Sequence, residues 1–151
     1  PMDRLDQLNT LYDHYRTELA KVKKAAGHGG FMGLGMDPRK HPCNQEFYEA
    51  VEAWVRQFLA QSPTHEAIFA ATEYILHAPV GQEQELTYGY LFAAQVHCCL
   101  LIPYLTAEER QTLWTWYDGA FPEQVRLPAQ QKVAALLSGQ RPKKRRFFGL
   151  F

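Results

Sequence analysis

Two short clusters of histidine and cysteine contain the residues of this chain that are best suited to metal chemistry. Their nitrogen and sulfur atoms are ligands that zinc prefers, and the clusters read His41-Pro42-Cys43 and His97-Cys98-Cys99. We expect the second cluster to be helical, and successive helical side chains point about 100° apart, so its residues cannot all face one ion. The chain contains neither Cys-x-x-Cys nor His-Glu-x-x-His. We therefore expect free thiols, no metal and no cofactor.

Cys43 is also the best candidate for a catalytic nucleophile, because such a thiol needs a nearby base and His41 lies close in sequence. Both residues belong to residues 27–43, whose five glycines and two prolines exclude a regular element and predict a long loop. The loop lacks the Gly-Lys-Ser/Thr of a phosphate-binding loop, and no strand precedes it. We expect its apolar side chains to pack on the domain. One possible function is therefore a metal protein or enzyme that uses this loop. Its metal ligands would be His41, Cys43 and either His97 or Cys98. It is the second of two alternatives to the main prediction given below.

Two other histidines have ordinary structural explanations. Glu73 and His77 are four residues apart, so they share a helix face. A di-iron helix pair requires Glu-x-x-His, with the residues three apart, and we expect a solvent-facing contact instead. His97 has mainly apolar neighbours in the sequence, which predicts a hydrogen-bonded histidine in the core.

The least ordinary feature is the segment 141–151, which reads RPKKRRFFGLF. Its five basic residues leave residues 1–140 with 11 basic and 16 acidic residues, a formal charge of −5. Aromatic side chains supply the desolvation energy of a complex, and a positive block raises its rate of encounter with an acidic partner. The predicted partner-binding residues are Lys143, Lys144, Arg145, Arg146, Phe147, Phe148, Leu150 and Phe151.

Two short resemblances cover only this segment. Pro142-Lys143-Lys144-Arg145-Arg146 looks like a monopartite nuclear import signal, which implies nuclear localisation if the source is eukaryotic. Phe147-Phe148-Gly149-Leu150-Phe151 is similar to the short aromatic tails that dock on sliding clamps. It departs from that pattern because Gln140 lies too far upstream.

The sequence therefore predicts a non-catalytic protein–protein interaction module that uses residues 141–151 to bind a protein partner. The alternative is association with an anionic membrane surface or nucleic acid through the same segment, where each basic residue contributes about 1 kcal/mol near a charged surface. Three cysteines, two of them adjacent, are a poor disulfide framework, and the first residues form no apolar leader. We expect a cytoplasmic protein.

The elements that must position these residues are all predicted to be helices, forming a compact all-α bundle of about six helices within a single domain, residues 1–140. Apolar residues recur every three or four positions, and no stretch alternates as a strand would. We expect Asn44 to cap the second helix, Ser62 the third and Thr106 the fifth. The predicted helices cover approximately residues 3–26, 44–61, 63–78, 83–102, 106–119 and 128–138.

The fourth helix, residues 83–102, is apolar nearly all round and is predicted to be the buried centre. Residues 86–105 lack formal charge over the length of a bilayer span. Gln95 and His97 would be costly in a membrane, so we expect a helix buried in the domain and not a transmembrane one. We expect four of its side chains to be buried: Leu91, Ala94, Cys98 and Leu101. We expect Trp54 and Trp114 to pack into the same core.

Composition and charge limit the remaining classes. With 46% hydrophobic and 21% charged residues, the chain is not of the disordered class, and its 16 basic and 16 acidic residues give no overall charge that would predict nucleic-acid binding. The first helix has an apolar seam from Leu5 to Val22. We expect this seam to pack on the fourth helix of the same molecule, so a monomer is preferred to a dimer.

Overall fold

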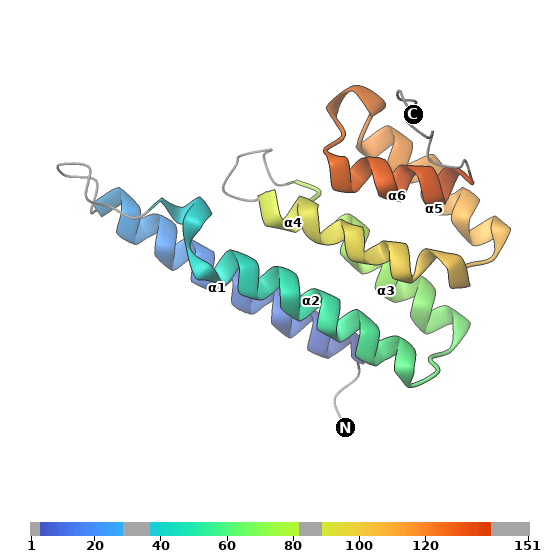
Figure 1. Ribbon diagram of the computed structural model, residues 1–151, viewed down its shortest axis with the longest axis horizontal. Coiled ribbons are helices and arrows are strands. Elements are labelled where there is room, and N and C mark those ends of the chain that lie inside the picture. Colours follow the sequence, from blue (N-terminus) through green and yellow to red (C-terminus); the bar gives the residue numbers. More distant parts are fainter. Residues whose placement is uncertain (1–3, 29–36, 82–88, 140–151) are drawn as a thin grey trace, which may run out of the picture.

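The structure is a computed structural model that describes residues 4–28, 37–81 and 89–139. Every regular element in these ranges is helical (Figure 1). The α-helices are α1 (Arg4–His28), α2 (Pro42–Ala60), α3 (His65–His77), α4 (Gly89–Ala93), α5 (Ala107–Ala120) and α6 (Pro128–Ser138). Short 3-10 helices are η2 (Pro38–Lys40), η4 (Ala94–Leu100), η5 (Ile102–Tyr104) and η6 (Glu123–Val125). The predicted all-α bundle of about six helices is confirmed.

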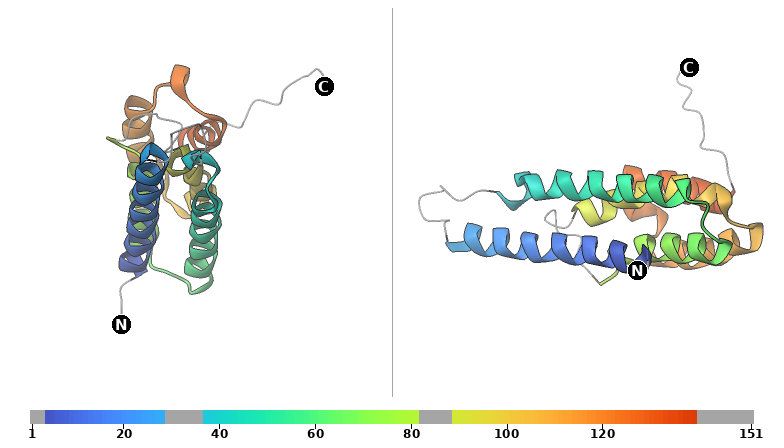
Figure 2. Two further views of the ribbon diagram at one scale, coloured as in Figure 1. Left: turned by 90° about the vertical axis from the view of Figure 1, so that its left-hand side faces the viewer. Right: turned by 90° about the horizontal axis from the view of Figure 1, so that it is seen from below.

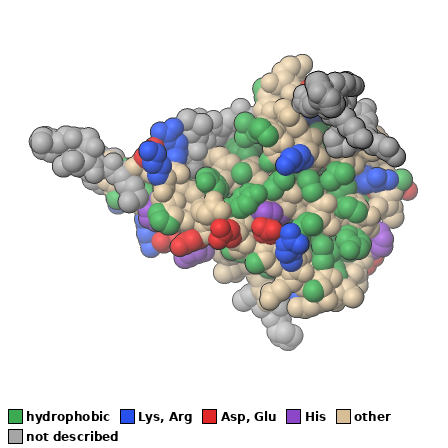
Figure 3. All heavy atoms as spheres, viewed as in Figure 1, with side chains coloured by type: hydrophobic (Ala, Val, Ile, Leu, Met, Phe, Trp, Pro, Cys, Tyr) green, Lys and Arg blue, Asp and Glu red, His purple; other side chains and the backbone are tan. Residues whose placement is uncertain are grey.

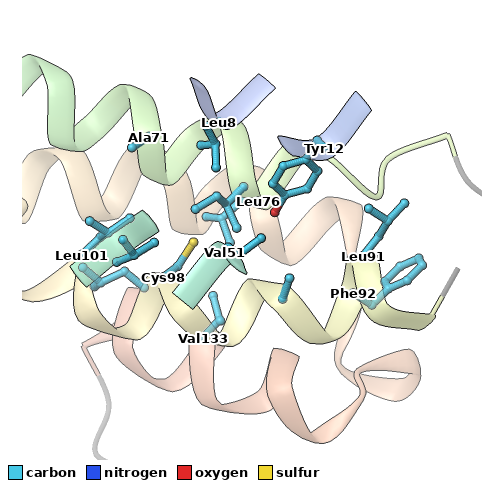
Figure 4. Close-up of a cluster of buried hydrophobic side chains, with 14 of the residues drawn as sticks. Leu8, Tyr12, Val51, Ala71, Leu76, Leu91, Phe92, Cys98, Leu101 and Val133 are labelled. Atoms are coloured by element: carbon cyan, nitrogen blue, oxygen red, sulfur yellow. The ribbon is translucent and has the colours of Figure 1, made fainter. Parts of the chain in front are cut away.

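The helices form two neighbouring groups around the α4–η4 segment. Helices α1 and α2 lie side by side and antiparallel, and α5 and α6 lie on the opposite side of α4–η4 (Figures 1 and 2). The buried apolar residues form one continuous cluster that extends from Leu8 to Leu137 along the chain. Figure 4 shows side chains of α1, α2, α3 and α6 converging on this central segment.

The central helix differs from its predicted form. We expected one helix over residues 83–102, but α4 covers only Gly89–Ala93, and the chain then tightens into η4. In a 3-10 helix, side chains three residues apart lie above one another, and this stacks Gln95, Cys98 and Leu101 on one fully buried row. The four residues predicted to be buried here are all buried: Leu91, Ala94, Cys98 and Leu101. Residues 82–88 lie outside the described residues.

The two tryptophans predicted to lie in the core are half-buried and pack against it. Trp54 stacks on Phe58 with ring centroids 4.7 Å apart. Trp114 lies under the Arg126 guanidinium, whose centre is 5.2 Å from the ring centroid. Both rings therefore cover the core at its edge, with one side towards solvent.

The seam of the first helix packs within the molecule but on a different partner. Leu8, Tyr12 and Leu19 are fully buried, and α1 contacts chiefly α2 rather than the central α4–η4 segment. The seam therefore packs more on α2, which returns antiparallel along α1 (Figure 1), than on the fourth helix as predicted, although Leu8 and Tyr12 also point into the cluster around the central segment (Figure 4). Among the described helices, none has the length and apolar composition needed to cross a membrane.

Helix ends were predicted well where a cap has one good candidate. The Thr106 hydroxyl accepts from the Glu109 amide at 3.0 Å, and the Glu109 carboxylate accepts from the Thr106 amide at 2.9 Å, so the capping box is confirmed. Gly139 ends α6 with a φ of 76°, a conformation that favours glycine. The Ser62 cap is wrong. Thr64 caps α3 by accepting from the Ala67 amide at 3.1 Å, and Ser62 occupies the preceding turn with a φ of 51°.

Residues 27–43 were predicted to lack regular elements, but the described residues at both ends of this range are helical. Helix α1 continues to His28, η2 begins at Pro38, and α2 begins at Pro42. Proline is favourable at the first position of a helix, because its φ is already suitable and it has no amide hydrogen that would lack a partner there. Pro38 and Pro42 therefore begin helices, although they were expected to prevent a regular element. Residues 29–36 lie outside the described residues.

Candidate functional site

A groove lies between α1 and the first half of α2. It has a volume of about 500 Å³, which is within the usual range for binding sites. Its apolar surface includes Leu11, Tyr15 and Phe47, and its polar lining includes His14, Glu18 and Glu46. The groove therefore combines an apolar surface with carboxylates from two different helices.

The apolar side of the groove is held rigidly by ring packing. Tyr15 of α1 and Phe47 of α2 are buried and stack with ring centroids 4.1 Å apart and an interplanar angle of 10°. Tyr12 meets the edge of the same Phe47 ring at 4.8 Å. Aromatic pairs of this kind contribute about 0.5–1.5 kcal/mol beyond their buried area, so the groove is formed before any ligand arrives.

Asn44 fixes the end of the groove at which α2 begins. Its side chain is almost fully buried, and its Oδ1 accepts from the Tyr15 hydroxyl at 2.6 Å. Its Nδ2 lies within hydrogen-bond distance of three carbonyl oxygens, those of Pro38 at 2.8 Å, His41 at 3.0 Å and Arg39 at 3.3 Å. The prediction that Asn44 caps α2 is therefore wrong, because its amide joins the η2 turn to α1 from inside the helix.

His41 is the cap that Asn44 was expected to be. Its Nδ1 accepts from the Cys43 amide at 3.1 Å, at the N-terminal end of α2. Burial raises the pKa of the Cys43 thiol, and the carboxylates of Glu18 and Glu46 raise it further. The reactive form of cysteine is the thiolate. The surroundings of Cys43 therefore disfavour the nucleophile that the sequence suggested, and His41 directs Nδ1 at a backbone amide.

The sequence-predicted metal ligands are not brought together. His41 and Cys43 line the groove between α1 and α2, whereas the Cys98 thiol is fully buried and donates to the Thr72 carbonyl at a sulfur–oxygen distance of 3.8 Å. Within residues 4–28, 37–81 and 89–139, no three His, Cys, Asp or Glu side chains are placed to hold a metal ion. The three cysteines are free thiols.

Glu73 and His77 interact through the backbone instead of through their side chains. The His77 Nδ1 lies 2.8 Å from the Glu73 carbonyl oxygen. The imidazole stacks on Trp116 of α5 with ring centroids 3.7 Å apart. His77 therefore joins α3 to α5 at the surface by stacking on the indole of Trp116.

His97 is the hydrogen-bonded core histidine that the sequence predicted. It is buried, and its Nε2 donates to the Tyr48 carbonyl at 3.0 Å. Burial lowers the pKa of His97 below its ordinary value of 6.5, and nearby Arg56 acts in the same direction while Glu52 opposes both. The native imidazole is therefore neutral at pH 7.

This histidine makes the stability of the domain depend on pH. Because the pKa is lower in the native state, the unfolded chain binds a proton more readily, and stability is lost as the pH falls below about 6.5 towards the native pKa. We expect the urea midpoint to fall between pH 7 and pH 5, and we expect His97→Gln to flatten this part of the profile. An unchanged slope in His97→Gln would contradict the assignment.

The predicted partner-binding residues, Lys143 to Arg146, Phe147, Phe148, Leu150 and Phe151, lie outside the described residues. Sequence reasoning singled out His41 and Cys43 but missed the groove that they line. A signal was present, because Leu11, His14 and Glu18 recur at helical spacing along one flank of α1. The residues of α2 that line the other side of the groove could not be recognised from the sequence, because they are identified only by the packing of α1 on α2.

Comparison with known proteins gives this site no precedent. The chain matches no protein-family model, and no curated protein or solved structure matches it.

Proposed function

We propose that this protein is a non-catalytic interaction module whose helical domain carries residues 141–151 as the partner-binding element. The observation that carries the proposal is the composition of that segment, a basic block followed by Phe147, Phe148, Leu150 and Phe151. Burying four large apolar side chains contributes about 6–12 kcal/mol before ordering costs. Micromolar affinity requires about 8 kcal/mol, so the segment has enough apolar surface for a specific complex.

Two features of the described residues support binding over catalysis. The thiol of Cys43 has a raised pKa, and His41 beside it uses its Nδ1 to cap α2. The free thiols suit a reducing compartment such as the cytoplasm. The partner that fits the segment is a protein surface with acidic residues around an apolar pocket, since each half of the segment then has a matching surface.

The test compares the full chain with a chain lacking residues 141–151. Proteins captured by the full chain but not by the shorter chain are identified, and their binding is measured by surface plasmon resonance. We expect Phe148→Ala with Phe151→Ala to weaken binding at least tenfold with little change in salt dependence. We expect replacement of Lys143 to Arg146 by glutamine to lower the association rate and flatten the salt dependence.

Two outcomes would replace this proposal. If the shorter chain keeps every interaction but melts at a lower temperature, the segment only stabilises the domain. If the segment instead binds anionic vesicles or nucleic acid with a steep salt dependence, the alternative of a charged surface is correct.

A further inference from the structure

The groove between α1 and α2 has carboxylates on both of its sides. Glu18 comes from α1 and Glu46 from α2, and both act on the Cys43 thiol that lies in the groove. Glu18 has Lys21 3.4 Å away, whereas no cation pairs with Glu46 among the residues that the structure describes. A cationic ligand would therefore find one free carboxylate and one that is only weakly paired at the surface.

The negative charge continues along α2 beyond the groove. Glu49 follows Glu46 by three residues, which keeps the two close together on the helix surface, whereas the next carboxylate, Glu52, is paired with Arg56 at 2.9 Å. Figure 3 shows acidic side chains following one another across the face on which α2 lies. A basic peptide with adjacent charges matches Glu46 and Glu49, together with Glu18 across the groove, better than a single amine does.

Between its carboxylates the groove has an apolar lining, whose more exposed part is formed by Leu11 and Ala50, since Tyr15 and Phe47 are almost fully buried beneath it. Leu11 is half-buried, and Tyr15 and Phe47 form a stacked pair that Asn44 holds in place through the Tyr15 hydroxyl. A volume of about 500 Å³ accommodates a few side chains and no folded domain. The matching occupant is a short segment with cations next to aromatic residues.

We propose that this groove is a docking site for basic-aromatic peptide segments and that residues 141–151 of this chain are its occupant. The segment combines five basic residues with three phenylalanines, and its charge is opposite to that of Glu18 and Glu46. Residues 29–36 also neighbour the start of α2 in the sequence, but they contain no charged residue. Charge complementarity therefore favours residues 141–151 over that loop.

This inference rests on the proposed function in treating residues 141–151 as a recognition element, and it adds a regulatory consequence. An external partner must compete with the groove for the same segment. When the segment is docked, its phenylalanines are covered. A partner that binds the segment more tightly releases it, and the groove becomes empty.

The decisive experiment titrates a labelled peptide, RPKKRRFFGLF, into protein comprising residues 1–140 and follows fluorescence anisotropy. The buried cluster extends only from Leu8 to Leu137, so removing the segment takes away no described core contact. We expect saturable binding, and we expect the full chain to bind the peptide at least fivefold more weakly, because its own segment occupies the groove. Backbone amide shifts should change at Thr10, His14 and Glu46.

Two groove variants and a matched control locate the binding. We expect Glu18→Gln with Glu46→Gln to weaken peptide binding at least tenfold, and Thr10→Trp, at an exposed position lining the groove, to block it without a change of charge. The control is Glu66→Gln with Glu123→Gln, which removes the same charge at exposed positions outside the groove and should bind normally. Circular dichroism confirms that each variant is folded.

The outcomes separate this inference from the proposed function. If the peptide does not bind, or if the control pair weakens binding as much as the groove pair does, the groove is not the docking site. That result leaves capture of an external partner by residues 141–151 untouched, because capture is measured on the full chain. Conversely, peptide binding that depends on Glu18 and Glu46, in a chain that captures no partner, supports the groove and contradicts the proposed function.

Discussion

Replacing Gln95 by alanine is expected to lower the free energy of unfolding by about 3–5 kcal/mol, because its amide joins three buried groups from three helices. Its Nε2 donates to the Leu76 carbonyl at 2.9 Å. Its Oε1 accepts from the Tyr117 hydroxyl at 2.8 Å and from the Gln130 Nε2 at 3.2 Å. Gln95, Gln130 and Tyr117 are all fully buried, so water cannot replace the lost partner without entering the core.

The measurement is urea unfolding followed by far-ultraviolet circular dichroism. Gln111→Ala is the control, since Gln111 is exposed and its amide donates to Thr115 at 3.4 Å; we expect a change below about 0.5 kcal/mol. Tyr117→Phe should cost about 1 kcal/mol, because Gln95 then still accepts from Gln130. A loss below about 1 kcal/mol in Gln95→Ala would show that the three groups find other partners.

The helices and most of their ends were predictable because their signals are local. The spacing of Leu8, Tyr12, Tyr15 and Leu19 marks a buried face whatever that face meets, and these four residues are buried. The capping box depends only on Thr106 and Glu109, three residues apart. The third helix was capped two residues too early because Ser62 and Thr64 are both good caps, and only the backbone conformation decides between them.

The polar contacts of the core were not predictable, because each one joins residues far apart in the sequence. Gln95 lies among apolar residues and its bonded partner Gln130 is 35 positions away, so nothing near either residue indicates the other. The Tyr12 hydroxyl was also unpredicted, since it is buried and has no hydrogen-bond partner among the described residues. The spacing of apolar residues predicts that this ring is in the core, but it gives no information on the hydrogen bonds of the hydroxyl oxygen.

The groove was not predicted because its lining residues also come from separate parts of the sequence, although two of them, His41 and Cys43, were candidate site residues. His41 and Cys43 were singled out for metal and thiol chemistry, yet their roles depend on a turn that Asn44 fastens to α1. The chemical type of a residue shows what it can do in a suitable setting. Only the packing of α1 on α2 shows that the setting here is a groove with a carboxylate on each side.

Replacing Asn44 by alanine is expected to lower the free energy of unfolding by about 2–4 kcal/mol and to abolish the order of the η2 turn. The change removes the acceptor of the Tyr15 hydroxyl and leaves the carbonyls of Pro38 and His41 without their side-chain donor. Urea unfolding measures the first effect, and amide hydrogen exchange at residues 37–43 measures the second. Gln45→Ala is the matched control, because the Gln45 amide is exposed and donates to Glu49 on the helix surface.

Asn44→Asp separates the two halves of this side chain. A carboxylate still accepts from the Tyr15 hydroxyl but cannot donate to the three carbonyls around Nδ2, so the bond to α1 survives while the turn is repelled. We therefore expect faster exchange in residues 37–43 with either substitution, and loss of the Tyr15 contact only with alanine. Because the turn places His41 beside the groove, Asn44→Ala should also bind the RPKKRRFFGLF peptide more weakly. Normal peptide binding in a variant with a loosened turn would show that Leu11, Tyr15 and Phe47 suffice to form the groove.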